Sequence, residues 1–166
     1  MNQGFRTSCM PIVMAALSFI PGRAAAQTDT VLTVSGDVER PCAFTMAAFA
    51  GLPHASVRAK GHDARASEFD GVLLTEILKR AGVRFGPDVR ERITSAVILR
   101  ATDGYQAVFS LAELDTAFTD RRIVLADRKD GKPITGSDGP LRMVVPGEKE
   151  HARWVRKVAS LVVRRL

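Results

Sequence analysis

Short segments in which apolar and polar residues alternate recur from residue 31 onward, and turn residues separate most of them. Alternation with a period of two places the apolar side chains on one face of a strand. We expect strands at 31–35, 56–60, 95–101, 106–109, 123–126, 141–145 and 159–163. Because turns connect these strands more often than crossover helices do, the pattern predicts an α+β domain built on mixed or antiparallel sheets.

Helices are fewer than strands in this pattern. The clearest covers residues 73–81, where Leu74, Ile77 and Leu78 recur at helical spacing and Gly82 follows as a C-cap. Two shorter helices are expected at 46–50 and 111–114, after the N-cap candidates Thr45 and Ser110. Turns and loops are expected at the Asp103–Gly104 hairpin, at 61–67 and at 127–139.

Residues 1–26 have the composition of a secretory signal peptide. Arg6 stands before an apolar run at residues 10–20, and a stretch of small residues ends at Ala26. The run is too short to span a bilayer, which takes ~20 apolar residues, and small residues mark a cleavage site. The alternative, a buried amphipathic helix, needs a polar face, for which the run offers only Ser18. We therefore expect cleavage after Ala26, a single domain at 27–166 and a periplasmic location.

The expected mature chain contains one cysteine. Cleavage removes Cys9 and leaves Cys42, so an internal disulfide cannot form even in an oxidising compartment. Because Cys42 stands just before an apolar run, it is interpreted as a small buried residue rather than a nucleophile. The hydrophobic core therefore has to stabilise the fold.

Composition and charge exclude several classes of protein. With 46% hydrophobic and 25% charged residues, the chain is unlike disordered or fibrous proteins. Its formal net charge is +6, but the densest basic clusters are only the pairs 121–122 and 164–165. A nucleic-acid binder gathers its basic residues in one stripe with interleaved aromatics, so no nucleic-acid partner is expected. The 3 histidines, His54, His62 and His151, are far apart in sequence and form no zinc motif.

The rare aromatic residues of the second half lie near cations. Tyr105 is the only tyrosine and Trp154 the only tryptophan, and Phe109 follows Tyr105 on the same expected strand. These rings form a candidate stacking slot for a flat heterocycle, since offset stacking adds ~1 kcal/mol beyond area burial. The alternative interpretation makes them ordinary core or rim aromatics.

Charged residues near these rings extend the candidate site. Asp103 is suited to pair with an amino-pyrimidine edge. Arg142 or Arg153 is suited to hold an anionic tail. The pattern therefore indicates a binding site for a flat, partly anionic molecule if the aromatic residues face a pocket.

A series of short motifs is spread over nearly the whole expected mature chain. The most specific is GPLRMVVPG at 139–147, followed by Arg-Trp-Val-Arg at 153–156. Others occur at 34–38, 44–46, 69–74, 101–105, 109–114, 124–126 and 130–133. In this order the motifs resemble the molybdopterin-binding domain of the sulfite oxidase family, in its small stand-alone exported form. The resemblance implies the α+β fold of that family, with mixed or antiparallel sheets and short helices, and a pterin-shaped pocket.

One residue of the family pattern is missing. Catalytic members ligate molybdenum through a cysteine in the segment that corresponds here to residues 57–66, because a soft thiolate suits a sulfur-rich metal site. That segment contains no cysteine, and Cys42 lies well before the expected position. The departure argues against bound molybdenum and against the oxidoreductase activity of the family, while the pterin pocket would persist.

The chain is similar to a cysteine-less branch of this fold, a periplasmic pterin-binding protein that acts with membrane-bound cyclic-di-GMP enzymes. In that branch the pterin stacks on aromatic residues, including a tryptophan in an Arg-Trp-Val segment that Trp154 matches. The resemblance implies a non-catalytic sensor or carrier of a reduced pterin. The residues implied in binding are Trp154 with Phe109 or Tyr105 on the ring, Asp103 at the amino edge, and Arg142 and Arg153 at the tail.

Two other functions remain open from the sequence. One is a molybdopterin-dependent oxidoreductase, or an electron-transfer accessory to one, in which the metal sits without a cysteine and is tightly bound. The other is a structural exported domain whose pocket is filled by Trp154 and Phe109, which predicts a buried tryptophan and no ligand.

Overall fold

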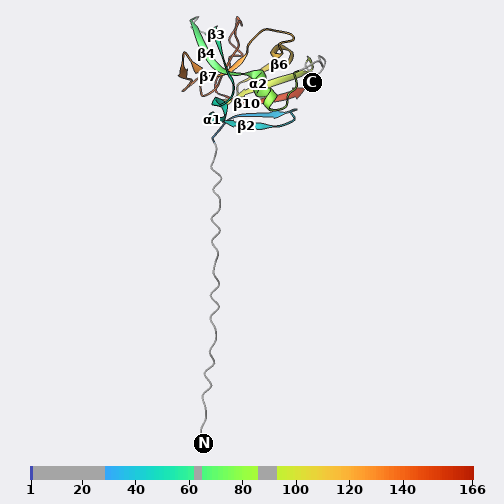
Figure 1. The fold of residues 1–166 in the computed structure, drawn as a ribbon, viewed down its shortest axis with the longest axis vertical. Coiled ribbons are helices and arrows are strands. Elements are labelled where there is room, and N and C mark those ends of the chain that lie inside the picture. Colours follow the sequence, from blue (N-terminus) through green and yellow to red (C-terminus); the bar gives the residue numbers. More distant parts are fainter. Residues whose placement is uncertain (2–28, 62–64, 86–92) are drawn as a thin grey trace.

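The computed structural model describes residue 1 and residues 29–61, 65–85 and 93–166. Within these ranges the chain forms two five-stranded sheets with few short helices (Figure 1). This architecture confirms the predicted α+β class. The predicted signal peptide, apart from residue 1 and including Cys9, lies outside the described residues, as does His62. No helix among the described residues is long and apolar enough to cross a membrane.

The first sheet has the strand order β2-β1-β10-β5-β6. Its strands are β1 (Thr30–Gly36), β2 (Cys42–Thr45), β5 (Ser95–Ala101), β6 (Gln106–Ser110) and β10 (Val158–Arg165). The central pair, β1 and β10, is parallel, with Thr33 opposite Ser160. The other neighbours are antiparallel, so the sheet is mixed. The β5–β6 hairpin turns at the predicted Asp103–Gly104, where Gly104 has a φ of 88°.

The second sheet is antiparallel and has the strand order β3-β4-β7-β8, with β9 also paired to β7. Its strands are β3 (His54–Lys60), β4 (Ala66–Leu73), β7 (Val124–Lys129), β8 (Lys132–Pro133) and β9 (Arg142–Val144). In Figure 1 the labels β3, β4 and β7 lie at the upper left, and β2, β10 and β6 lie below them or to the right.

The helices agree with the sequence pattern to within a few residues. They are α1 (Met46–Ala50), α2 (Leu74–Arg80) and the 3-10 helix η1 (Ala112–Leu114). The Thr45 hydroxyl accepts a hydrogen bond from the Ala48 amide at 3.1 Å, as expected of an N-cap. On α2 the apolar stripe Leu74, Ile77 and Leu78 is buried. Gly82 follows with a φ of 84°, a conformation that favours glycine.

The structure departs from the predicted strands mainly at β2, β4 and β8. The predicted loop 61–67 is wrong at its end, because Ala66 and Ser67 begin β4. In β4 the polar Ser67 occupies a buried position. The alternation of buried and exposed positions along this strand is therefore not matched by an alternation of apolar and polar residues. The predicted turn region 127–139 includes the end of β7 and all of β8. Strands of two to four residues are too short to leave a periodic signal.

Both sheets contribute to one hydrophobic core. Leu99 and Phe109 come from the first sheet, and Phe69 and Leu125 from the second. Trp154 belongs to the same cluster. The candidate site therefore lies against the core and depends on its packing.

Gly71 lies where β4 and β7 approach each other closely. The pairing of β4 with β7 shifts register between Asp70 and Gly71. A Cβ atom on Gly71 would lie 2.2 Å from the Leu125 oxygen and 2.4 Å from the Ala126 Cα. Because both neighbours are backbone atoms, a side chain there would force the two strands apart.

We expect Gly71→Ala to destabilise the protein by about 1 to 3 kcal/mol, the usual cost of overpacking. Gly51→Ala is the matched control, because the nearest atoms to its added Cβ lie at 3.6 and 3.7 Å, an ordinary contact. Thermal unfolding followed by circular dichroism measures both variants. A Gly71→Ala protein that unfolds at the wild-type temperature would contradict this account of the close approach between β4 and β7.

Candidate functional site

The candidate site is built on residues 145–157, which connect β9 in the second sheet to β10 in the first. We call this connection the crossing segment. The Val155 oxygen accepts a hydrogen bond from the Met143 amide at 2.8 Å, and the Val158 amide donates to the Leu141 oxygen at 3.0 Å. These bonds hold the crossing segment along β9 before the chain enters the first sheet.

Trp154 lies on the crossing segment and is 5% exposed. Its Nε1 donates to the Val145 oxygen at 3.0 Å, which satisfies the buried indole donor. Its ring meets Phe69 edge to face at 5.6 Å and His151 at 4.8 Å between centroids. The guanidinium carbon of Arg142 lies 5.7 Å from the ring centroid. The indole is therefore fixed by contacts on several sides.

A cavity of about 260 Å³ lies beside Trp154. We call it the tryptophan cavity. Its lining residues are Asp103, Tyr105, His151, Ala152, Trp154, Val155 and Arg156. The hairpin between β5 and β6 supplies Asp103 and Tyr105, and the crossing segment supplies the rest.

Hydrogen bonds fix the hairpin side of the tryptophan cavity. The Tyr105 hydroxyl donates to the Ala152 oxygen at 2.8 Å, which ties the hairpin to the crossing segment. Asp103 accepts a hydrogen bond from the Tyr105 amide through Oδ1 at 3.0 Å. Tyr105 is 49% exposed, so its ring stands at the cavity rim and is open to solvent.

A second cavity, of about 240 Å³, lies near the first, because Trp154 contacts Phe69 and Arg142 of its lining. We call it the arginine cavity. Its lining residues are Phe69, Lys129, Lys132, Pro133, Ile134, Thr135, Asp138 and Arg142. Arg142 is next to Trp154, and Asp138 lies 2.6 Å from Arg142 Nη1 and 3.6 Å from Arg156 Nη1.

Arg142 keeps an unused donor. Its Nε is buried and has no hydrogen-bond partner within the described part of the chain. An unsatisfied buried donor costs free energy, which an acceptor brought within its reach would recover. Lys129 and Lys132 add positive charge to the same cavity.

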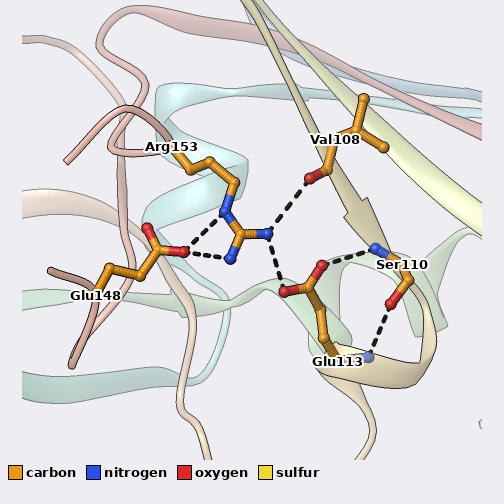
Figure 2. A network of polar contacts seen from close by, with 5 residues as sticks. All are labelled: Val108, Ser110, Glu113, Glu148 and Arg153. Carbon is orange, nitrogen blue, oxygen red and sulfur yellow. Dashed lines mark hydrogen bonds and ion pairs between the residues drawn. The ribbon is translucent and has the colours of Figure 1, made fainter. Parts of the chain in front are cut away.

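Arg153 points elsewhere. Its Nε lies 2.8 Å from Glu148 Oε1 and its Nη1 lies 2.9 Å from Glu113 Oε2, as Figure 2 shows. The guanidinium carbon also lies 4.5 Å from the ring centroid of Phe109, which is fully buried. Partial burial lowers the pKa of Arg153, but the hydrogen bonds and charges of Glu113 and Glu148 outweigh this effect and raise it.

The structure brings together some of the predicted site residues. Asp103, Tyr105 and Trp154 share the tryptophan cavity, and Arg142 lines the adjoining arginine cavity. Neither Phe109 nor Arg153 is among the residues that line these two cavities. Phe109 is in the core, and Arg153 covers it, so stacking of a ligand on Phe109 would require rearrangement.

Sequence reasoning missed several lining residues. His151 and Arg156 flank the Arg-Trp-Val motif, and that position was the signal that could have identified them. Phe69, Lys129 and Lys132 come from strands of the second sheet, and nothing in their local sequence links them to Trp154.

Strand β3, whose last residues belong to the segment without the family cysteine, ends beside the tryptophan cavity. His151 Nε2 lies 2.8 Å from the oxygen of Lys60, the last residue of β3, and this carbonyl accepts the bond. Cys42 is on β2, whereas Tyr105 precedes β6, and these two strands form opposite edges of the first sheet. Cys42 is also only partly buried, not fully as expected, and its burial raises the pKa of the thiol although Arg40 lowers it.

A larger cavity, of about 590 Å³, lies at the ends of β1 and β10 near the turn after α2. The described residues that line it include no aromatic side chain. Two of its charged residues, Arg84 and Glu39, form an ion pair at 2.8 Å, and Asp37 accepts a hydrogen bond from the backbone amide of Arg165 at 2.9 Å. Size alone therefore does not make it the better candidate, since binding sites combine apolar walls with a few convergent polar groups.

Comparison with known proteins agrees with this fold. The profile of the family described as oxidoreductase molybdopterin binding domain matches residues 20–165. The chain belongs to this family. A search of curated proteins gave no match.

Among solved structures, the molybdopterin-binding domain described here is similar to the sulfane dehydrogenase SoxCD from Paracoccus pantotrophus. The TM-score is 0.65 at 23% sequence identity, and the match covers 82% of this chain. The chain spans 38% of the length of that SoxCD chain. The likeness confirms the sulfite oxidase-type fold.

The burial of Trp154 predicts a distinct fluorescence spectrum. Because it is the only tryptophan and its indole donor is bonded to Val145, we expect a blue-shifted emission maximum and weak quenching by acrylamide. Urea unfolding should shift the emission to the red. An emission maximum like that of free tryptophan in water, before urea is added, would contradict the packing described for the crossing segment.

Proposed function

We propose that this protein binds a pterin in the tryptophan cavity and does so without the thiolate that catalytic relatives use. The observation that carries the proposal is the convergence of Trp154, Tyr105 and Asp103 beside the end of β3. Two rings and a carboxylate at one cavity suit a flat, amino-substituted heterocycle.

The tryptophan cavity fits the aromatic part of such a ligand. The exposed ring of Tyr105 offers a stacking face at the rim, and Trp154 forms the inner wall. The side chain of Asp103 lines the same cavity and is placed to accept hydrogen bonds from an amino edge. Arg156, also in the lining, is 61% exposed and adds positive charge at the opening.

The arginine cavity fits an anionic tail. The buried Nε of Arg142 lacks a partner, and Lys129 and Lys132 line the same space. A phosphate or carboxylate would supply the missing acceptor and offset the charges of the two lysines, since Asp138 already pairs with Arg142. Each cavity, of about 260 and 240 Å³, is slightly smaller than the ~300–1,000 Å³ of typical small-molecule sites, so the proposed ligand occupies both.

The donor set does not fit a molybdenum ion bound as in catalytic relatives. No cysteine occurs between residues 57 and 66, and Cys42 is on the far edge of the first sheet. Within the described part of the chain no group of three or more His, Cys, Asp or Glu side chains is arranged for a metal. We therefore propose a pterin-type ligand and derive no redox step.

An oxidoreductase or accessory role is the second candidate, because the family is named for oxidoreductases. It requires the metal to bind through the cofactor alone, without a protein thiolate. A purely structural domain is a weaker candidate. Phe109 and Trp154 are buried as that function predicts, but the two cavities beside Trp154 remain open.

We further propose an exported, non-catalytic sensor or carrier, cleaved after Ala26, that transmits pterin occupancy to the periplasmic domain of a membrane-bound cyclic-di-GMP enzyme. This part rests on the resemblance stated for the sequence. A ligand acts on a partner only through a difference between the bound and free states. The mass of the protein recovered from the periplasm, and its capture of such an enzyme with and without pterin, test these two steps.

The ligand content of the protein separates the first two functions. We expect protein expressed with its N-terminal segment, in a host that makes molybdopterin and ordinary pterins, to contain pterin without molybdenum. Elemental analysis measures the metal, and fluorescence after acid release measures the pterin. Stoichiometric molybdenum would instead establish the oxidoreductase function despite the missing cysteine.

Substitutions in the tryptophan cavity test the binding residues. We expect Trp154→Ala to weaken pterin binding at least tenfold, since stacking contributes ~1 to 3 kcal/mol per ring. Because loss of a buried tryptophan also costs ~3 to 5 kcal/mol of stability, Tyr105→Ala at the exposed rim is the safer variant. Asp103→Asn, which retains the shape and Oδ1, should weaken binding about fivefold.

Isothermal titration calorimetry with tetrahydrobiopterin, without oxygen, measures these affinities. Val108→Ala is a control, because Val108 is 54% exposed on β6 and does not line either cavity. Wild-type affinity in both Tyr105→Ala and Asp103→Asn would remove the hairpin from the binding site.

A further inference from the structure

Arg153 and Trp154 are consecutive residues that contact different sheets. Arg153 contacts Val108 and Phe109 of β6, a strand of the first sheet. It also contacts Glu113 of η1, the helix that follows β6 in the chain. Trp154 packs against Phe69 of β4 in the second sheet. Because the two residues are consecutive, the contacts of Arg153 with the first sheet also restrict where Trp154 packs against the second sheet.

The groups that hold Arg153 are themselves fixed. Glu113 Oε1 accepts a hydrogen bond from the Ser110 amide at 2.8 Å, and the Ser110 hydroxyl accepts one from the Glu113 amide at 3.2 Å. This reciprocal pair is a capping box, which leaves Glu113 Oε2 directed to Arg153 (Figure 2). Phe109 beneath the guanidinium is fully buried. Arg153 thus contacts a rigid part of the molecule.

The other end of the network lies on the crossing segment itself. Glu148 Oε1 accepts hydrogen bonds from both Nε and Nη2 of Arg153, so the guanidinium binds it with two donors. Five residues apart, these two side chains close a loop within the crossing segment. His151 and Ala152 lie inside this loop and line the tryptophan cavity. The loop therefore presents part of the cavity wall.

We propose that Arg153 is a positioning residue that fixes the shape of the tryptophan cavity, because its contacts hold the crossing segment against β6 and η1. We call this set of contacts the clamp. Its flat guanidinium stacks on Phe109, binds Glu148 through two nitrogens and reaches Glu113 with a third, an arrangement that the single ammonium nitrogen of a lysine does not reproduce. The role differs from the direct contact with an anionic tail that the sequence suggested, and it rests on the proposed pterin site.

The test compares Arg153→Lys with wild type. We expect acrylamide quenching of Trp154 to rise about twofold and its emission to shift to the red in ligand-free protein, because lysine keeps the charge but loses the clamp. The affinity for tetrahydrobiopterin should fall about fivefold or more, because displaced residues of the crossing segment would no longer match the shape of the ligand. Arg84→Lys is the matched control. Arg84 also binds one glutamate oxygen, of Glu39, through Nε and Nη2, but it is 84% exposed.

Each outcome decides the proposal. Changes in both fluorescence and affinity, absent in Arg84→Lys, support it. An unchanged Trp154 spectrum with lost affinity would mean that Arg153 contacts the ligand directly. An unchanged affinity with a changed spectrum would mean that the position of the crossing segment does not affect ligand binding. Either result overturns the positioning role.

Two further measurements keep the test decisive. If Arg153→Lys does not fold, Glu148→Gln removes one charge of the clamp with little change of shape, and the same shifts are expected at smaller size. If wild-type protein binds no tetrahydrobiopterin, the proposed function fails, but the fluorescence of ligand-free variants still shows whether Arg153 fixes Trp154.

Discussion

The position of β10 in the middle of the first sheet determines where a binding site can form. β10 pairs with β1 on one side and with β5 on the other, whereas the preceding strand β9 belongs to the second sheet. The chain must therefore cross between sheets just before β10. The residues that make this crossing meet the tip of the β5–β6 hairpin, and the tryptophan cavity is the space enclosed between them.

Two arginines illustrate how packing separates residues that look alike in sequence. Arg153 has its donors engaged by Glu113, Glu148 and the Val108 carbonyl. Arg142 has one ion pair, with Asp138, and a buried Nε that lacks a partner within the described residues. A group with a buried unsatisfied donor gains from a ligand, whereas a group held by four hydrogen bonds would have to lose some of them to turn toward one. Arg142 is therefore the better candidate to contact an anion.

Local sequence patterns predicted much of the fold. Alternation identified the long strands β1, β5, β6 and β10, and helical spacing identified α2, because burial of one face requires these patterns. β4 was missed because polar Ser67 occupies a buried position, and β8 because two residues carry no period. The parallel pairing of β1 with β10 depends on contacts between opposite ends of the domain, so no local pattern encodes it.

The candidate site was predicted in part, for a similar reason. Asp103 and Tyr105 belong to one turn, and Trp154 belongs to a recognisable motif, so their chemistry was visible in the sequence. Which face of a strand Phe109 presents, and to which sheet Arg153 turns, depend on the packing of the two sheets against each other. His151 and Lys129 enter the site only through that packing.

The central position of β10 also has a consequence for protection of the sheet against aggregation. Both neighbours of β10 present backbone groups that only this strand satisfies, and each carries buried apolar residues such as Val34 and Val97. A chain without β10 would leave the facing edges of β1 and β5 unpaired, and both strands are apolar. Unpaired edges of this kind are templates for pairing with other chains. By pairing with both β1 and β5, β10 therefore protects the first sheet against edge-to-edge pairing with other chains.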